Sequence, residues 1–123
     1  MHEEKIALVR QQIAAVRAAA EKREIRDIYV AACGGSLATL CPIQYVLERE
    51  TDAVSVSAVN AAEFYRDPPR RVGEHALVIL NSQSGTTAET GAAARLARER
   101  GALRAAFTTV PGSAIGAGVD CPI

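Results

Sequence analysis

The sequence lacks most of the features that indicate a macromolecular partner. Its 123 residues contain no tryptophan and only 4% aromatic residues, and its 14 basic and 14 acidic side chains cancel to a formal net charge of zero. A neutral chain has no overall field that would attract nucleic acid or an anionic membrane. No apolar run approaches the roughly 18 residues that a membrane-spanning helix needs. We therefore expect one domain of the usual size, about 100–150 residues, with no nucleic-acid or membrane partner.

Cysteine is scarce, and the familiar cofactor motifs are absent. Cys33, Cys41 and Cys121 form an odd set without CxxC or metal-ligand spacing. Cys33 and Cys121 lie in apolar runs, so we expect buried free thiols rather than ligands or nucleophiles. The pair Gly34-Gly35 lacks the third glycine of a dinucleotide-binding turn, and no GxxxxGK[ST] motif occurs. We expect neither a metal nor a cofactor.

The N-terminal segment, residues 3–23, has the pattern of an amphipathic helix. Ile6, Val9, Ile13 and Val16 recur at spacings of three and four residues, which places them on one helical face. Such a helix can pack on its own domain or on a partner subunit, and the sequence leaves both open. Because the charged start of the chain lacks the apolar core of a signal peptide, we expect a cytoplasmic protein.

Short apolar runs alternate with helical stretches in the rest of the chain. The expected strands are 27–33, 53–58, 76–80, 103–108 and a last run from Val119 to Ile123, and the expected helices are about 36–50, 60–65 and 87–100. This alternation predicts a doubly wound α/β domain with a parallel sheet and right-handed crossovers. We assign the leading helix to residues 1–25 and the domain to residues 26–123. The domain is expected to be incomplete at its C-terminal end, because no helix follows the last strand.

Three details concern the ends of the helices. Pro42 predicts either a kink or a helix that begins only near Cys41. Asn60 is a suitable N-cap for the short second helix. Thr86 and Glu89 have the spacing of a capping box, which predicts where the third helix begins.

Two turns that follow predicted strands share a chemistry. In an open parallel sheet, ligands bind outside the carboxyl ends of the strands. In Cys33-Gly34-Gly35-Ser36, the glycines allow the backbone to approach a ligand and the serine adds a hydroxyl. The turn Ser82-Gln83-Ser84-Gly85-Thr86-Thr87 offers four hydroxyls and one amide just before a helix N-terminus, which carries partial positive charge. Neither turn contains lysine or arginine, so a phosphate would be held there by neutral donors.

Both turns also have a purely structural interpretation. Serine and threonine are common caps, and Gly-Gly is a common turn dipeptide. The density of hydroxyls in the second turn, and the expected adjacency of the two strands, favour a binding site. His75, at the start of a predicted strand, is not expected to be catalytic.

Three segments together resemble the sugar isomerase (SIS) domain family: 32–36 (Ala-Cys-Gly-Gly-Ser), 81–90 (Asn-Ser-Gln-Ser-Gly-Thr-Thr-Ala-Glu-Thr) and 109–113 (Thr-Val-Pro-Gly-Ser). The second segment is similar to the family's Ser-x-Ser-Gly-x-Thr signature. The variant Cys-Gly-Gly-Ser, followed by Leu37-Ala38, resembles the fructoselysine 6-phosphate deglycase branch more than the isomerase half of glucosamine-fructose-6-phosphate aminotransferase. The resemblance implies a flavodoxin-like, five-stranded sheet in three layers and a phosphorylated sugar or sugar-amine as ligand.

The family's binding positions carry over residue by residue. The resemblance implies phosphosugar binding by the following residues: Gly35, Ser36, Ser82, Gln83, Ser84 and Thr87, with Val110 near the sugar. The family's catalytic glutamate and histidine lie in a second domain, so no catalytic residue matches here. We expect the N-terminal SIS domain of a deglycase- or isomerase-like protein, without turnover of its own. The alternative is a non-catalytic, phosphosugar-sensing regulatory domain. We also expect a homo-oligomer such as a dimer. Apolar surface exposed near Val119 to Ile123 predicts low stability or self-association, because a partner tends to cover such surface.

Overall fold

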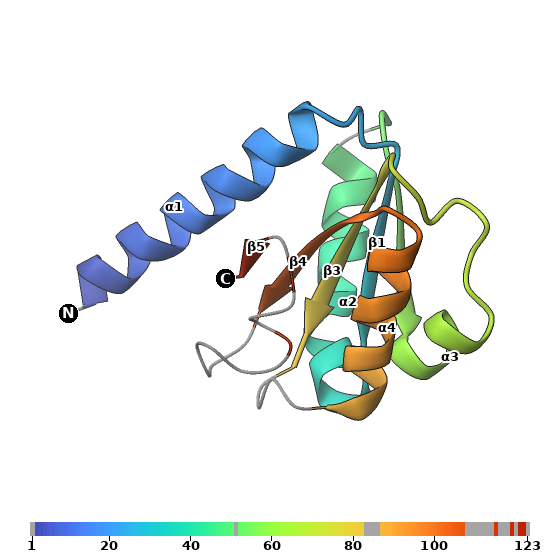
Figure 1. The fold of residues 1–123 in the computed structure, drawn as a ribbon. Coiled ribbons are helices and arrows are strands. Elements are labelled where there is room, and N and C mark those ends of the chain that lie inside the picture. The colour runs from blue at the N-terminus through green and yellow to red at the C-terminus, as the bar shows by residue number, and fades with distance from the viewer. Residues whose placement is uncertain are drawn as a thin grey trace.

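A parallel β-sheet organises the chain in the computed structural model (Figure 1). The structure describes residues 2–50, 52–82 and 87–107, together with 115, 119, 121 and 122. The sheet has the order β2-β1-β3-β4-β5, with every neighbouring pair parallel. Its strands are β1 (Asp27–Ala32), β2 (Ser55–Asn60), β3 (Ala76–Asn81), β4 (Leu103–Phe107) and β5 (Cys121–Pro122). The expected α/β fold with a parallel sheet is confirmed.

The last strand begins later than the sequence predicted. Four strands of five or six residues form the body of the sheet, whereas β5 has two residues at its edge. Val119, the expected start of this strand, lies in a bend before it. An edge strand has a neighbour on one side only, so fewer backbone hydrogen bonds define its length.

Helices cover both faces of the sheet, as right-handed crossovers require (Figure 1). The helices are α1 (His2–Glu21), α2 (Gly34–Glu50), α3 (Ala61–Arg66) and α4 (Ala88–Glu99). The chain moves toward one edge from β1 to β2 and toward the other edge from β3 to β4. Crossovers of one hand therefore place α2 on the face opposite α3 and α4.

The ends of the helices confirm the predicted cap of α3 and correct the predicted starts of α2 and α4. Asn60 caps α3, and its side chain accepts a hydrogen bond of 2.9 Å from the backbone N–H of Ala62. In contrast, α2 already begins at Gly34 and continues through Pro42, so a start near Cys41 is wrong. A proline removes one backbone hydrogen bond, but α2 is also tied to the sheet: the side-chain oxygen of Gln44, two residues later, accepts a hydrogen bond of 3.2 Å from the N–H of Ala58 in β2.

The start of α4 differs by one residue from the expected capping box. The helix begins at Ala88, and Thr87 is the N-cap, with an extended backbone at φ −61° and ψ 120°. Thr86, the expected cap, lies outside the described residues. The side chain of Thr87 makes no capping hydrogen bond. Its hydroxyl instead contacts that of Ser82, as described for the candidate site below.

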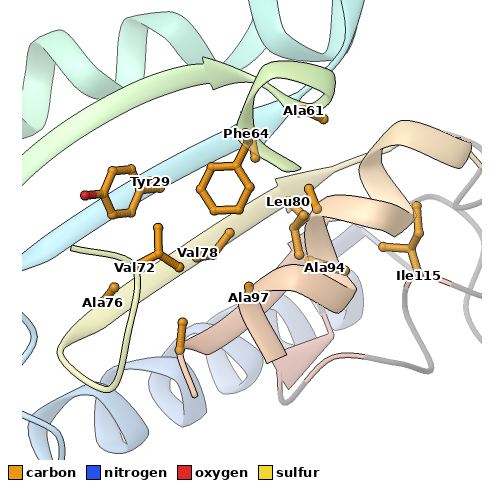
Figure 2. Close-up of a cluster of buried hydrophobic side chains, with 14 residues drawn as sticks. Tyr29, Ala61, Phe64, Val72, Ala76, Val78, Leu80, Ala94, Ala97 and Ile115 are labelled. Atoms are coloured by element: carbon orange, nitrogen blue, oxygen red, sulfur yellow. The ribbon is translucent and has the colours of Figure 1, made fainter. Parts of the chain in front are cut away.

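The larger core lies between the sheet and helices α3 and α4 (Figure 2). Phe64 of α3 and Val78 and Leu80 of β3 are fully buried there. Ala94 and Ala97 of α4 face the same core. Their small side chains let the helix approach the sheet closely, so the alanine-rich composition has a direct packing role.

A second core on the other face includes the end of α1. Val16, Ala19 and Ala20 of α1 pack with Leu77 of β3 and Leu103 of β4. The last turns of the leading helix therefore pack on their own domain, which was one of the two possibilities left open. Within the described residues, no helix is both long and apolar enough to span a membrane.

Replacing Phe64 tests the larger core. Phe64 is fully buried, and its ring centroid lies 5.9 Å from that of Tyr29. We expect Phe64→Ala to lower the free energy of unfolding by about 3–5 kcal/mol, measured by urea denaturation, because it leaves a cavity. Tyr45→Ala, which removes a ring that is 63% exposed on α2, is the control and should change little.

If Phe64→Ala does not fold, Phe64→Leu provides a milder change that still reports on the same packing. Its loss of stability should be smaller, about 1–2 kcal/mol. Equal effects of Tyr45→Ala and Phe64→Ala would contradict the assignment of this core.

Candidate functional site

The predicted site residues that the structure describes lie at one end of the sheet. β1 and β3 are neighbours in parallel register, with Ala32 opposite Asn81, so both strands end at the same level. Ser36 lies in the first turn of α2, directly after β1. Ser82 directly follows β3, and Thr87 caps α4. The two hydroxyl-bearing turns therefore leave the sheet side by side.

A hydrogen bond joins the two turns directly. The side-chain amide of Asn81, the last residue of β3, donates to the backbone carbonyl oxygen of Ser36 at 3.0 Å. Asn81 was not among the predicted site residues. A polar amide at the end of the otherwise apolar strand 76–81 was the signal for its role.

Ser82 anchors the start of the second turn. Its residue is only 1% exposed, and its backbone N–H donates to the carbonyl oxygen of Phe107 in β4 at 3.1 Å. Its hydroxyl oxygen lies 2.9 Å from that of Thr87, and either group can donate. This contact closes the turn across five residues and links the end of β3 to the start of α4.

The hydroxyl pair stands beside the N-terminus of α4. Ser82 and Thr87 bring two hydroxyl groups together there, and each hydroxyl can both donate and accept hydrogen bonds. The first N–H groups of α4 have no partner within the helix, and the helix dipole adds partial positive charge there. This arrangement suits an anion that accepts several hydrogen bonds.

The glycine-rich turn has an open surface. Gly34 has φ +53°, a conformation that favours glycine. Gly35 is exposed, and a Cβ atom added there would have no described atom within 4 Å apart from its own stretch of chain. The N–H of Ser36 is bonded to the carbonyl oxygen of Cys33 at 3.1 Å, so Ser36 offers its hydroxyl rather than its backbone. Cys33 is a free, half-buried thiol.

Three predicted positions cannot be placed. Gln83, Ser84 and Val110 lie outside the described residues. In the part of the chain that is described, no group of three histidine, cysteine, aspartate or glutamate side chains could hold a metal ion.

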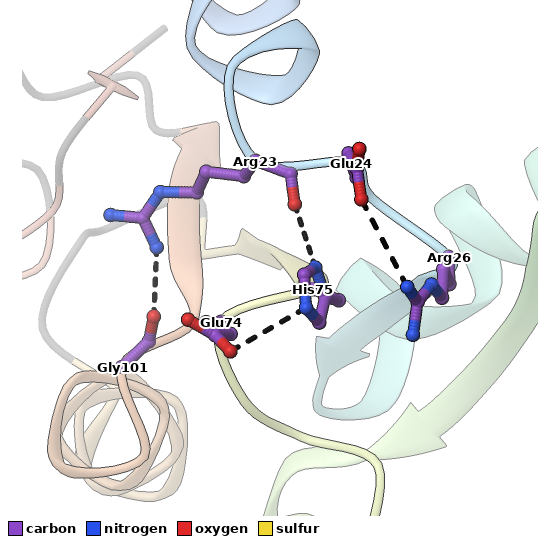
Figure 3. Close-up of polar contacts among 6 residues, drawn as sticks. All are labelled: Arg23, Glu24, Arg26, Glu74, His75 and Gly101. Atoms are coloured by element: carbon purple, nitrogen blue, oxygen red, sulfur yellow. Dashed lines mark hydrogen bonds and ion pairs between the residues drawn. The ribbon is translucent and has the colours of Figure 1, made fainter.

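His75 lies at the other end of the sheet, where the strands begin (Figure 3). Its Nδ1–H donates to the carbonyl oxygen of Arg23 at 2.8 Å, and its Nε2 lies 3.5 Å from a carboxylate oxygen of Glu74. A cavity of about 540 Å³ lies here, lined by Lys22, Arg23, Glu24, Glu74, His75 and Gly101. The charges of both signs in this lining contrast with the neutral hydroxyls at the carboxyl ends.

The pKa of one side chain in the sheet, the phenol of Tyr29, is shifted from its ordinary value. Burial raises the pKa of the Tyr29 phenol, the nearby Asp27 carboxylate raises it further, and Arg71 partly offsets the rise. Arg71 forms an ion pair of 2.9 Å with Asp27, whose side chain is 8% exposed. These groups hold the segment before β3 against β1.

Known proteins are similar to this chain in sequence and in fold. The family model for the SIS domain matches residues 23–123. Fructosamine deglycase FrlB from Bacillus subtilis (strain 168) is 39% identical over 107 residues, which cover 87% of this chain and 33% of that protein. Fructoselysine 6-phosphate deglycase from Escherichia coli (strain K12) is 38% identical over 87 residues, which cover 71% of this chain and 25% of that protein.

A solved structure agrees with these matches. The crystal structure of a candidate phosphosugar isomerase from Salmonella typhimurium LT2 superimposes with a TM-score of 0.85 and 34% identity, over 89% of this chain and 33% of that chain. The resemblance inferred from the sequence motifs is thereby confirmed. The chain spans about a third or less of the length of these three proteins.

The link between the turns can be tested by exchanging a donor for an acceptor. Asn81→Asp keeps the shape of the side chain but places an oxygen against the carbonyl oxygen of Ser36. We expect the free energy of unfolding to fall by about 1–3 kcal/mol, because a hydrogen bond becomes a repulsion. Urea denaturation measures this loss.

The same substitution at Asn60, the last residue of β2, is the control. Asn60 uses its side-chain oxygen as an acceptor for the N–H of Ala62, and aspartate caps helices equally well. Asn60→Asp should leave stability nearly unchanged. Equal losses in the two variants would argue against a donor role for Asn81.

Proposed function

Because the chain belongs to the SIS domain family, we propose that it binds the phosphate of a phosphorylated sugar or sugar-amine at the carboxyl ends of β1 and β3. The observation that carries this proposal is the bond between the side chain of Asn81 and the carbonyl oxygen of Ser36. It joins two hydroxyl-bearing turns at the end of a parallel sheet where ligands of such folds bind.

Neutral donors would hold the phosphate. We assign the following residues to the site, from both turns: Gly35, Ser36, Ser82, Gln83, Ser84 and Thr87. Thr87 has the strongest support among them, because its hydroxyl is not used for capping and stands at the N-terminus of α4. A hydrogen bond to a charged group contributes about 1.5–3 kcal/mol, so a few such bonds can bind a dianion without lysine or arginine.

We infer that the chain supplies the binding step of a larger enzyme. The relatives of 38–39% identity are named as deglycases, which favours an enzyme component over a sensing domain. The hydroxyls and amides assigned here donate hydrogen bonds to an anion, but their pKa values are too far from neutral for general acid–base catalysis. The proton transfer of a deglycase or isomerase would therefore require residues that we do not assign to this chain.

Titration calorimetry with fructose 6-phosphate, glucose 6-phosphate and fructose tests the proposal. We expect both phosphosugars to bind and the unphosphorylated sugar to bind much more weakly. Thr87→Val, which removes one hydroxyl with little change of shape, should weaken phosphosugar binding by about tenfold or more. A folded sample that binds neither phosphosugar would contradict the proposal.

Thr90→Val is the matched control on the same helix. Thr90 is fully buried, and its hydroxyl oxygen has no hydrogen-bond partner among the residues that the structure describes. Its removal should leave binding unchanged and raise the free energy of unfolding by about 1 kcal/mol, because an unsatisfied buried hydroxyl is lost. Equal weakening of binding by the two substitutions would show that Thr87 has no specific role.

Purified chain should show no turnover. We expect no isomerisation of fructose 6-phosphate and no release of amine from a 6-phosphorylated fructosamine, even when calorimetry detects binding. Turnover that co-purifies with the chain and disappears in Thr87→Val would show that acid–base residues are present after all.

A further inference from the structure

The cavity of about 540 Å³ at the amino ends of the strands is lined by charges of both signs. Lys22 and Arg23 give its lining two positive charges, and Glu24 and Glu74 give it two negative charges. Such a lining suits a ligand that carries both charges and is neutral overall. We propose that the cavity binds a free α-amino acid, with its carboxylate against the basic side chains and its ammonium group against the acidic ones.

Three segments that are far apart in the sequence form the walls of the cavity, and hydrogen bonds fix them to one another (Figure 3). The guanidinium of Arg23 donates to the carbonyl oxygen of Gly101 at 2.7 Å. The ring of His75 donates to the carbonyl oxygen of Arg23 at 2.8 Å, and the carbonyl oxygen of His75 accepts from the N–H of Arg26 at 2.8 Å. The chain itself therefore holds the walls in place, so a ligand need not order them.

The basic side chains of the lining can hold a carboxylate. Arg23 uses one N–H of its guanidinium on Gly101, whereas a guanidinium has five. Within the part of the chain that the structure describes, neither Lys22 nor Arg23 forms an ion pair. A ligand carboxylate has two oxygens, so it can accept hydrogen bonds from both side chains.

The acidic side chains of the lining suit an ammonium group. The carboxylate of Glu74 stands beside the ring of His75, 3.5 Å from its Nε2. Glu24 has a left-handed backbone at φ +53°, a conformation that is unfavourable for residues with a side chain and that glycine adopts freely. Its contact with Arg26 is long, at 3.9 Å. Backbone strain of this kind is concentrated at functional sites, and binding of a cation gives a reason for a carboxylate at this position.

The cavity is separate from the candidate phosphate site. β3 begins next to His75 and ends at Asn81, so its six residues span about 20 Å between the two places. One sugar-amine is too short to occupy both. The inference therefore does not rest on the proposed function.

Amide NMR spectra of the 123-residue chain, recorded during titration with L-alanine, propionate and ethylamine, test the proposal. Propionate lacks the ammonium group of alanine, and ethylamine lacks its carboxylate. We expect L-alanine to shift the amide signals of His75 and Gly101 and to bind about tenfold more tightly than either of the other compounds, because each of these loses one set of charged hydrogen bonds. Equal binding of propionate or of ethylamine would overturn the proposal, since the cavity would then recognise only one charge.

Two substitutions in the lining assign the charges separately. Lys22→Gln should weaken binding of L-alanine by about tenfold and leave ethylamine binding unchanged. Glu74→Gln should weaken binding of L-alanine to a similar extent and leave propionate binding unchanged. Both side chains are exposed, so the fold should persist. The same exchanges at Lys5 and Glu3, which are exposed on α1 outside the lining, are the controls and should change nothing.

Glu24→Gly should change stability and binding in opposite directions. Glycine adopts the left-handed conformation without strain, so the midpoint of urea denaturation should rise. Loss of the carboxylate should weaken binding of L-alanine by about tenfold. Unchanged binding in this variant would contradict the role of Glu24.

Two further outcomes would overturn the inference. The first is a folded chain whose His75 and Gly101 signals do not move at millimolar L-alanine. The second is binding that neither Lys22→Gln nor Glu74→Gln weakens. Phosphosugar binding should be unaffected in these variants, and binding of L-alanine should be unaffected in Thr87→Val, so the failure of one proposal is distinguishable from that of the other.

Discussion

The parallel pairing of β1 with β3 in a single register holds the candidate site together. Because Ala32 lies opposite Asn81, both strands end at the same level, and the side chain of Asn81 reaches the carbonyl oxygen of Ser36. A slip of one residue would turn every side chain of a strand to the other face of the sheet. The complete burial of Val30 and Leu80 opposes such a slip. The geometry of the turns therefore depends on the packing of the whole sheet.

Local sequence rules predicted those elements whose causes are themselves local. The apolar run of β3 and the cap at Asn60 belong to this class, because burial on both faces and one side-chain bond leave clear patterns. The continuation of α2 through Pro42 could not be predicted in this way. A local rule counts the hydrogen bond that proline loses, but it cannot count the bond from the N–H of Ala58 to Gln44, which exists only after β2 has paired with β1.

The distinction between local and long-range contacts also separates the predicted from the unpredicted parts of the site. That two turns at the ends of adjacent strands would meet could be expected from the fold class. The pairing of Ser82 with Thr87 could not, since the capping rule predicted Thr86 as the cap. Because Ser82 is held by β4 through Phe107, its hydroxyl stands where Thr87 can reach it. The contact of Ser82 with β4 thus contributes to the pairing of Ser82 with Thr87, and a local capping rule does not include it.

The two ends of the sheet carry different polar groups. At the amino ends, charged groups and carbonyl oxygens fasten α1 through Arg23 and His75, where a lasting contact is needed. At the carboxyl ends, neutral hydroxyls hold one another through bonds such as that of Ser82 with Thr87. A buried cation there would attract anions of many shapes. Hydroxyl and amide donors, in contrast, bind well only to an anion whose oxygen atoms lie along the directions of their hydrogen bonds. The selectivity of the proposed site would therefore derive from the register of the sheet rather than from charge.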